Sequence, residues 1–129
     1  MATTFKYLVS LIFLAFVIKG SCGQMCPLNS LQIVQRNTGQ VVAGKPLWRV
    51  EVINNCICDQ SQIMLSCNGF QSFEGVDPLI LKKIGDNCLL YNGHLLSPRN
   101  IDVFAYASDS SFPFVPVSSV TGTCHQKDI

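Results

Sequence analysis

Short segments with alternating apolar and polar residues recur along the chain, separated by Gly, Asn, Asp and Pro roughly every 8–15 residues. The clearest is 47–53, where Trp48, Val50 and Val52 fall on one face of an extended strand while Arg49 and Glu51 fall on the other. Further strands are expected at 31–36, 62–67, 88–96, 101–107 and 112–120. This pattern predicts an all-β domain, an antiparallel β-sandwich with Greek-key-like connections, with a small barrel as the alternative.

Turn residues between these segments suggest how the strands connect. Residues 37–39 read as a turn, and Asn92-Gly93 is a strong hairpin signal within 88–96. In 112–120, Pro113 and Pro116 lack the N–H that a ladder requires. We therefore expect 112–120 to be an extended segment at a sheet edge.

One short helix is expected near 78–84. Asp77 suits the cap, Pro78 the first helical position, Lys82 and Lys83 the last turn, and Gly85 the stop. It would have about two turns.

The N-terminus has the order of a secretory signal peptide. Lys6 is followed by the apolar run 7–18, and small residues occupy 21–23. A membrane span needs about 20 apolar residues, and Lys19 ends this run too early. We expect residues 1–23 to be removed, leaving a single domain at 24–129 that is soluble and secreted into the apoplast.

Cleavage at this position can be measured directly. The mature chain should begin at Gln24, with or without cyclisation to pyroglutamate, and should carry no free thiol. The intact mass of the secreted protein, taken with and without an alkylating agent before reduction, checks both points. A mass that retains Cys22, or a thiol that is alkylated, would contradict this boundary.

The cysteine count supports a disulfide framework. The chain has seven cysteines, and the signal peptide contains Cys22. An even number in a small secreted domain is typical of structural bridges. The six are Cys26, Cys56, Cys58, Cys67, Cys88 and Cys124. A zinc site would need a second matched pair of ligands, which the spacing does not supply.

The pairing of these cysteines is left open by the sequence. Six cysteines allow about 15 connectivities. Cys56 and Cys58 are too close in sequence to bond to each other without strain, so we expect them to take different partners. If 59–62 is a loop, Cys56 lies diagonal to Cys67 and the two become a candidate pair.

Composition and motifs argue against several classes of activity. The net charge is +1, and removal of Lys6 and Lys19 makes it −1, so no nucleic-acid or anionic-membrane partner is expected. The segment 39–46 only resembles a phosphate-binding loop, because Pro46 replaces the hydroxyl residue. His94 and His125 have no motif partners, and Asp59 is expected in a local turn. We expect no enzyme, no cofactor and no metal.

Aromatic residues gather in the C-terminal half. In 101–107, Phe104 and Tyr106 share one face, opposite Ile101, Val103 and Ala105. Each aromatic ring belongs either to the core or to an interface. The expected partner surface combines the turn Gly69, Phe70, Gln71 and Ser72 with Phe112 and Phe114.

Several segments together resemble the tapetum-determinant family of plant secreted proteins. They are "GKPLWRVEVINNCICDQSQIMLSCNGFQS", "VDPLIL", "GDNCLLYNG" and "FAYASDSSFPFVPVSSV". The resemblance covers nearly all of the chain from Cys26 to Cys124.

This resemblance implies a small extracellular cysteine-rich ligand that binds the ectodomain of a leucine-rich-repeat receptor kinase and influences cell fate in anther development. Two alternatives stay open: a β-sandwich that binds cell-wall carbohydrate without catalysis, and a structural or defence protein with no single partner. Coplanar exposed aromatic residues would favour the carbohydrate, and a contiguous apolar patch would favour the receptor.

Overall fold

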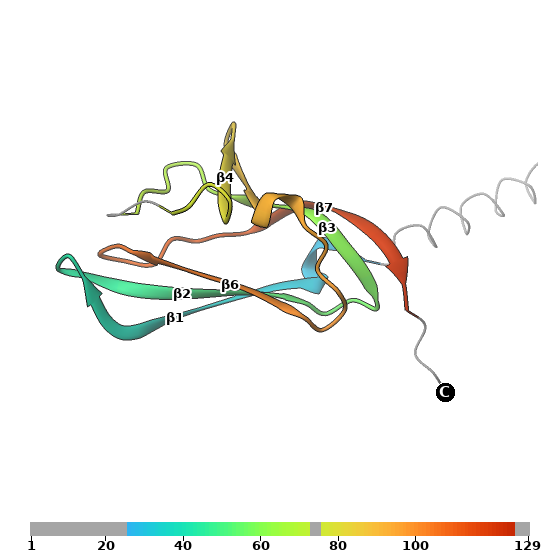
Figure 1. Ribbon diagram of the computed structural model, residues 1–129, viewed down its shortest axis with the longest axis horizontal. Coiled ribbons are helices and arrows are strands. Elements are labelled where there is room, and N and C mark those ends of the chain that lie inside the picture. The colour runs from blue at the N-terminus through green and yellow to red at the C-terminus, as the bar shows by residue number, and fades with distance from the viewer. Residues whose placement is uncertain (1–25, 73–75, 126–129) are drawn as a thin grey trace, which may run out of the picture.

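The computed structural model describes residues 26–72 and 76–125. In these residues the strands form two antiparallel sheets that face each other, as Figure 1 shows. The elements are η1 (Leu28–Ser30), β1 (Leu31–Val42), β2 (Lys45–Asn54), β3 (Cys58–Ser66), β4 (Leu81–Ile84), β5 (Asn87–Leu90), η2 (Tyr91–Gly93), β6 (Ile101–Ala107) and β7 (Pro116–Cys124). The strand orders are β1-β2-β6 and β4-β5-β3-β7. The predicted antiparallel β-sandwich is confirmed.

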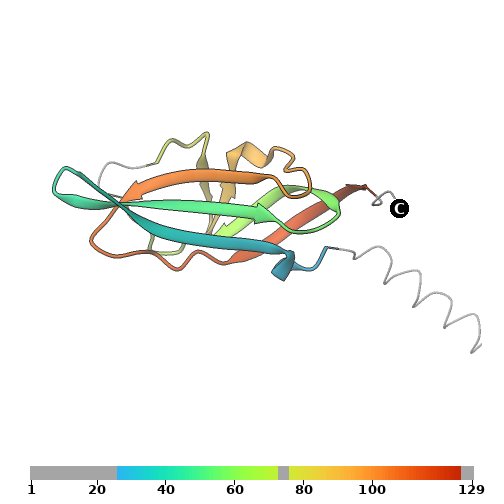
Figure 2. The same cartoon turned by 90° about the horizontal axis from the view of Figure 1, so that it is seen from below.

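Alternation in the three-stranded sheet determines which side chains enter the core. In Figure 2, β2 lies between β1 and β6, with the other sheet behind them. Val50 pairs with Phe104 and Trp48 with Tyr106. Val50, Phe104 and Tyr106 are buried, whereas Ile101 is exposed. The face of β6 that carries Phe104 and Tyr106 is therefore the core face.

The four-stranded sheet supplies the other half of the core. Its buried side chains include Ile63 and Leu65 on β3 and Leu81 and Leu90 on the β4–β5 hairpin. Full burial of each such side chain contributes about 1.5–3 kcal/mol relative to exposure. Phe114, from the segment that crosses between the sheets, packs into the same cluster.

The β1–β2 hairpin turns later than predicted. The turn lies at Ala43 and Gly44, which both have positive φ and join Val42 to Lys45. Two such residues suit the tight hairpin turns that match strand twist. Residues 37–39 instead belong to a bulge inside β1, where Gly39 has a φ of 84°. The turn predicted at 37–39 is therefore wrong.

The helix predicted near 78–84 is wrong. Asp77 does cap a turn, because its carboxylate accepts a hydrogen bond from the Leu79 N–H at 2.9 Å. After this single turn the chain becomes extended as β4, and Leu81 is buried opposite Leu90. Gly85 does not stop a helix; with Asp86 it forms the two-residue turn between β4 and β5.

Two other local predictions are also wrong. Asn92-Gly93 makes no hairpin; these residues form the turn η2, and Leu96 then bridges to Gln60 instead of pairing back on β5. Residues 59–62 are not a loop, because β3 already begins at Cys58 and continues past a bulge at Gln62. In both cases a tertiary partner overrides the local turn signal.

The C-terminal part of the predicted segment 112–120 does form an edge strand, β7. Among the described strands, β7 pairs only with β3 and lies at the edge of its sheet. The predicted signal peptide, the new N-terminus at Gln24 and the last residues, 126–129, lie outside the described residues. In the segments that the structure describes, no helix has the length and apolar character to span a membrane.

Candidate functional site

Three disulfides join the six cysteines. The pairs are Cys26–Cys56, Cys58–Cys124 and Cys67–Cys88. Cys56 and Cys58 take different partners, as predicted. The candidate pair Cys56–Cys67 is wrong, because these residues lie beyond opposite ends of β3. Cys56 instead bonds to the N-terminal segment, and Cys67 bonds to β5.

The segment around these cysteines also contains a buried amide pair, for which the sequence has no recognisable motif. Asn54 and Gln60 are completely buried. The Asn54 side chain donates to the carbonyl oxygens of Cys58 and Leu96, each at 2.9 Å. Its Oδ1 accepts from the N–H of Cys56 at 3.0 Å and from Gln60 Nε2 at 2.9 Å.

Gln60 extends this network to two more elements. Its Nε2 also donates to Ser30 Oγ at 3.1 Å, and its Oε1 accepts from Ser119 Oγ at 2.7 Å. Asn54 and Gln60 therefore tie η1, β2, β3 and β7 together. Fully satisfied buried amides of this kind fix one packing of the strands. The sequence segment 54–60 thus has a structural role.

Both histidines that the sequence left without partners lie within hydrogen-bonding distance of a carboxylate. His94 Nε2 lies 2.7 Å from Asp102 Oδ2, and His125 Nε2 lies 3.1 Å from Asp59 Oδ1. The local turn predicted at Asp59 is wrong, because Asp59 lies in β3 and its carboxylate contacts His125. Within the described chain neither ring hydrogen-bonds to a hydroxyl or thiol, so neither pair makes the nucleophile–base contact of a hydrolase triad.

Three sulfur atoms lie close together near the N-terminal end of the described chain. The Sγ atoms of Cys26, Cys56 and Cys58 lie within 4.8 Å of one another. Each is bonded in a disulfide. Metal binding needs the thiolate form, so this oxidised arrangement offers no cysteine ligand.

The two segments of the expected partner surface do meet in space. The ring of Phe70 lies 5.3 Å from that of Phe112 and 4.9 Å from that of Phe114, centroid to centroid. It also makes an edge contact with Tyr106 at 5.1 Å. These distances are within the favourable range for aromatic pairs.

Hydrogen bonds hold this aromatic cluster against the three-stranded sheet. The Tyr106 hydroxyl donates to Gln35 Oε1 and accepts from the N–H of Phe112, both at 2.6 Å. Burial raises the pKa of Tyr106, an effect that the N–H of Phe112 partly offsets. Tyr106 therefore stays protonated at physiological pH and keeps its donor role.

Burial divides the expected partner residues into two groups. Phe114 is buried, and Phe70, Ser72 and Phe112 are partly buried. The exposed members are Gly69 and Gln71, and Pro113 and Val115 are exposed next to them. Phe114 therefore belongs to the core, and only the rim around Phe70 and Phe112 is open to a partner.

This division predicts different effects for two alanine substitutions. Phe114→Ala should lower the free energy of unfolding by about 3–5 kcal/mol, because it empties a core site. Phe112→Ala should cost less, since its ring is partly exposed. Urea unfolding of both variants measures the difference. Equal losses would show that the two rings are buried to the same extent in solution.

Comparison with known proteins matches almost all of the described chain. The sequence profile described as Tapetum determinant 1, C-terminal, matches residues 27–124. The Arabidopsis thaliana protein named TPD1 protein homolog 1 is 32% identical over 102 residues, which cover 77% of this chain and 56% of that protein. The Oryza sativa subsp. japonica protein named TPD1 protein homolog 1B is 33% identical over 90 residues, covering 68% and 53%.

A third relative has a similar length. It is an uncharacterized Arabidopsis thaliana protein, 29% identical over 123 residues, which cover 92% of this chain and 95% of that protein. The chain spans about half the length of the two named relatives. No solved structure matches the chain.

Proposed function

Because the chain belongs to the tapetum determinant 1 family, we propose that it is a secreted plant signalling ligand. It binds the ectodomain of a leucine-rich-repeat receptor kinase in the apoplast and influences cell fate in reproductive development. The observation that carries this proposal is the family match, which spans residues 27–124 and hence both sheets, two complete disulfides and Cys56 of the third. No catalytic role is proposed.

The surface supports a protein partner over the alternative, cell-wall carbohydrate. In the described residues, the exposed large apolar side chains are all aliphatic. They include Val115, Val117 and Val120 on and beside the edge strand β7. Sugar binding by stacking would need exposed aromatic rings, whereas edge strands with apolar side chains suit docking of another chain.

A binding assay with a panel of receptor ectodomains tests this function. The secreted protein is immobilised through a C-terminal tag and exposed to purified leucine-rich-repeat ectodomains, with oligogalacturonides and xyloglucan fragments as carbohydrate probes. We expect saturable binding to at least one ectodomain and none to the sugars. A reduced and alkylated sample is the matched control and should not bind. Retention of sugars with no ectodomain bound would favour the carbohydrate alternative.

A further inference from the structure

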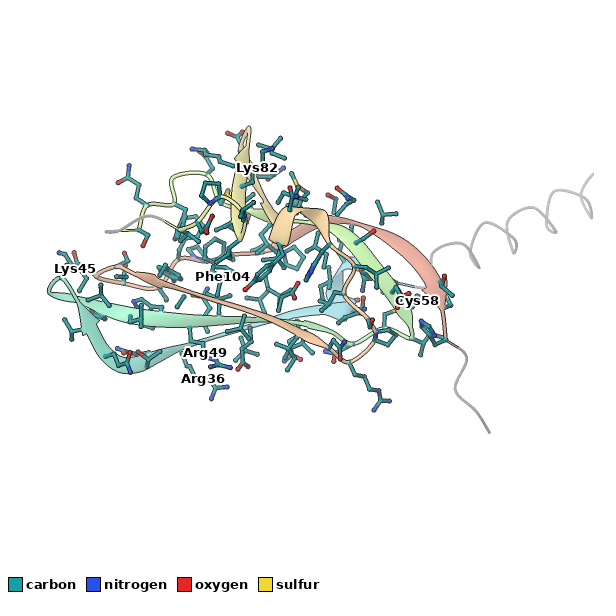
Figure 3. All side chains as sticks on the ribbon, in the orientation of Figure 1. Arg36, Lys45, Arg49, Cys58, Lys82 and Phe104 are labelled. Atoms are coloured by element: carbon teal, nitrogen blue, oxygen red, sulfur yellow. A yellow bond between two sulfur atoms is a disulfide. The ribbon has the colours of Figure 1, made fainter. Side chains whose placement is uncertain are left out.

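The outer face of the three-stranded sheet, the side turned away from the core, carries two arginines next to each other. Arg36 on β1 and Arg49 on β2 are direct cross-strand partners. Figure 3 shows both pointing away from the four-stranded sheet. Like charges placed directly opposite each other destabilise a sheet, so the fold gains nothing from this pair alone.

A single carboxylate lies between the two guanidinium groups. Glu51 Oε2 accepts from Arg49 Nε at 3.1 Å, and Glu51 Oε1 lies 3.5 Å from a terminal nitrogen of Arg36. The Glu51 side chain is 16% exposed, whereas those of Arg36 and Arg49 are 61% and 48% exposed. The carboxylate therefore lies beneath the two cations, and the group keeps a net charge of +1.

Most of the guanidinium donors are available to a ligand. Each guanidinium has five N–H donors in a planar fork. In the described residues, the only hydrogen bond of either side chain is the one from Arg49 Nε to Glu51. The terminal nitrogens of Arg49 have the geometry that binds a carboxylate through two parallel hydrogen bonds.

These arginines border a hollow of about 670 Å³ in the sheet surface. Ala105 on β6 pairs with Arg49 and leaves space beside it, because it has only a methyl side chain. Thr38 bounds the hollow on the β1 side; its hydroxyl donates to the carbonyl oxygen of Leu47 at 2.9 Å.

We propose that this hollow, the Arg36–Arg49 site, binds carboxylate side chains of an acidic peptide segment. The segment belongs to the protein partner of the proposed function, on which this inference rests. The ligand is expected to be anionic, because the two arginines share a single carboxylate, that of Glu51, and keep an excess positive charge. The apolar side chains of the walls are those of Leu47, Val103 and Ala105. Phe104 also borders the hollow, but its side chain is buried on the core face and is not available for stacking on a sugar. A peptide carboxylate therefore fits better than a uronic acid.

Fluorescence polarisation with a labelled hexaglutamate peptide at low salt tests the site. The double variant Arg36→Gln/Arg49→Gln should weaken binding at least about tenfold. Ala105→Ile, which fills the hollow without changing charge, should weaken it similarly and leave the melting temperature unchanged. The matched control is Lys82→Gln/Lys83→Gln, the same charge change on β4; Figure 3 shows Lys82 on the opposite side of the molecule. This control should bind like wild type.

Several results would overturn the inference. They are absence of hexaglutamate binding to wild type, equal weakening by the Lys82/Lys83 control, or tighter binding of an oligogalacturonide than of the peptide. A receptor ectodomain that binds wild type and the Arg36/Arg49 variant equally would also overturn it, yet leave the proposed function intact. If no ectodomain binds wild type, the proposed function fails, and the hexaglutamate titration still decides whether the site exists.

Discussion

Cys88→Ser is expected to give a poorly secreted and strongly destabilised protein. The Cys67–Cys88 bridge closes a loop of 21 residues in sequence between β3 and β5. Chain entropy predicts about 3 kcal/mol for a loop of this size, within the usual loss of about 2–5 kcal/mol. Both sulfur atoms lie in the buried cluster, so the substitution also places a hydroxyl in the core. The whole domain is expected to have only about 5–15 kcal/mol of stability.

Secretion yield and thermal unfolding measure this effect. The melting temperature should fall by at least about 10 °C, which corresponds to a loss of about 2–3 kcal/mol in a domain of this size. The double variant Cys67→Ala/Cys88→Ala controls for disulfide exchange by the thiol that the single variant frees, and it should also be destabilised. Wild-type yield and an unchanged melting temperature for both variants would show that this bridge is not part of the framework.

Asn54→Ala should lower the free energy of unfolding by about 3–5 kcal/mol. The substitution removes four hydrogen bonds from a completely buried position. Each buried polar group that loses its partner costs about 1–3 kcal/mol, and part of this loss will be recovered by relaxation or by water. Most single substitutions cost less, about 0.5–3 kcal/mol.

The neighbouring residue provides the control for Asn54. Asn55 is exposed, and among the described residues its side chain bonds only to the exposed Gln32. Asn55→Ala should therefore change stability by no more than about 0.5 kcal/mol. Urea unfolding of both variants gives the comparison. Similar small changes for the two would mean that the buried amide network does not hold the strands together.

The fold class could be predicted because the core strands have a local sequence signal, the alternation of apolar and polar residues. In 47–53 and 101–107 the apolar side chains alternate with polar or small ones, and the structure has these segments as β2 and β6. The errors occurred where a contact with another strand decides between two local options. Gly85 suits both a helix stop and a hairpin turn, and only the pairing of Leu81 with Leu90 selects the hairpin.

The candidate sites were harder to predict than the strands. The contact between Phe70 and Phe112 was expected, because 69–72 and the segment with Phe112 were predicted to form one surface. The burial of Phe114 was not, because it depends on how the segment that crosses between the sheets packs against the core. The alternation already placed Arg49 on the outer face. The position of Arg36 opposite Arg49 depends on the register of β1 with β2. That register could not be predicted, because the turn was placed wrongly at 37–39. The contact between His94 and Asp102 could not be predicted either, because it depends on the turn η2, which positions His94.

The most direct test of the signalling role is ligand-induced phosphorylation of the receptor. Plant cells that express a leucine-rich-repeat receptor kinase selected by the ectodomain panel are treated with purified secreted protein, and phosphorylation of the kinase domain is followed with dose. We predict a saturable increase with the native protein and none with the reduced and alkylated protein. Phosphorylation that does not respond to the native protein, or that responds equally to the unfolded one, would contradict a role as a folded extracellular ligand.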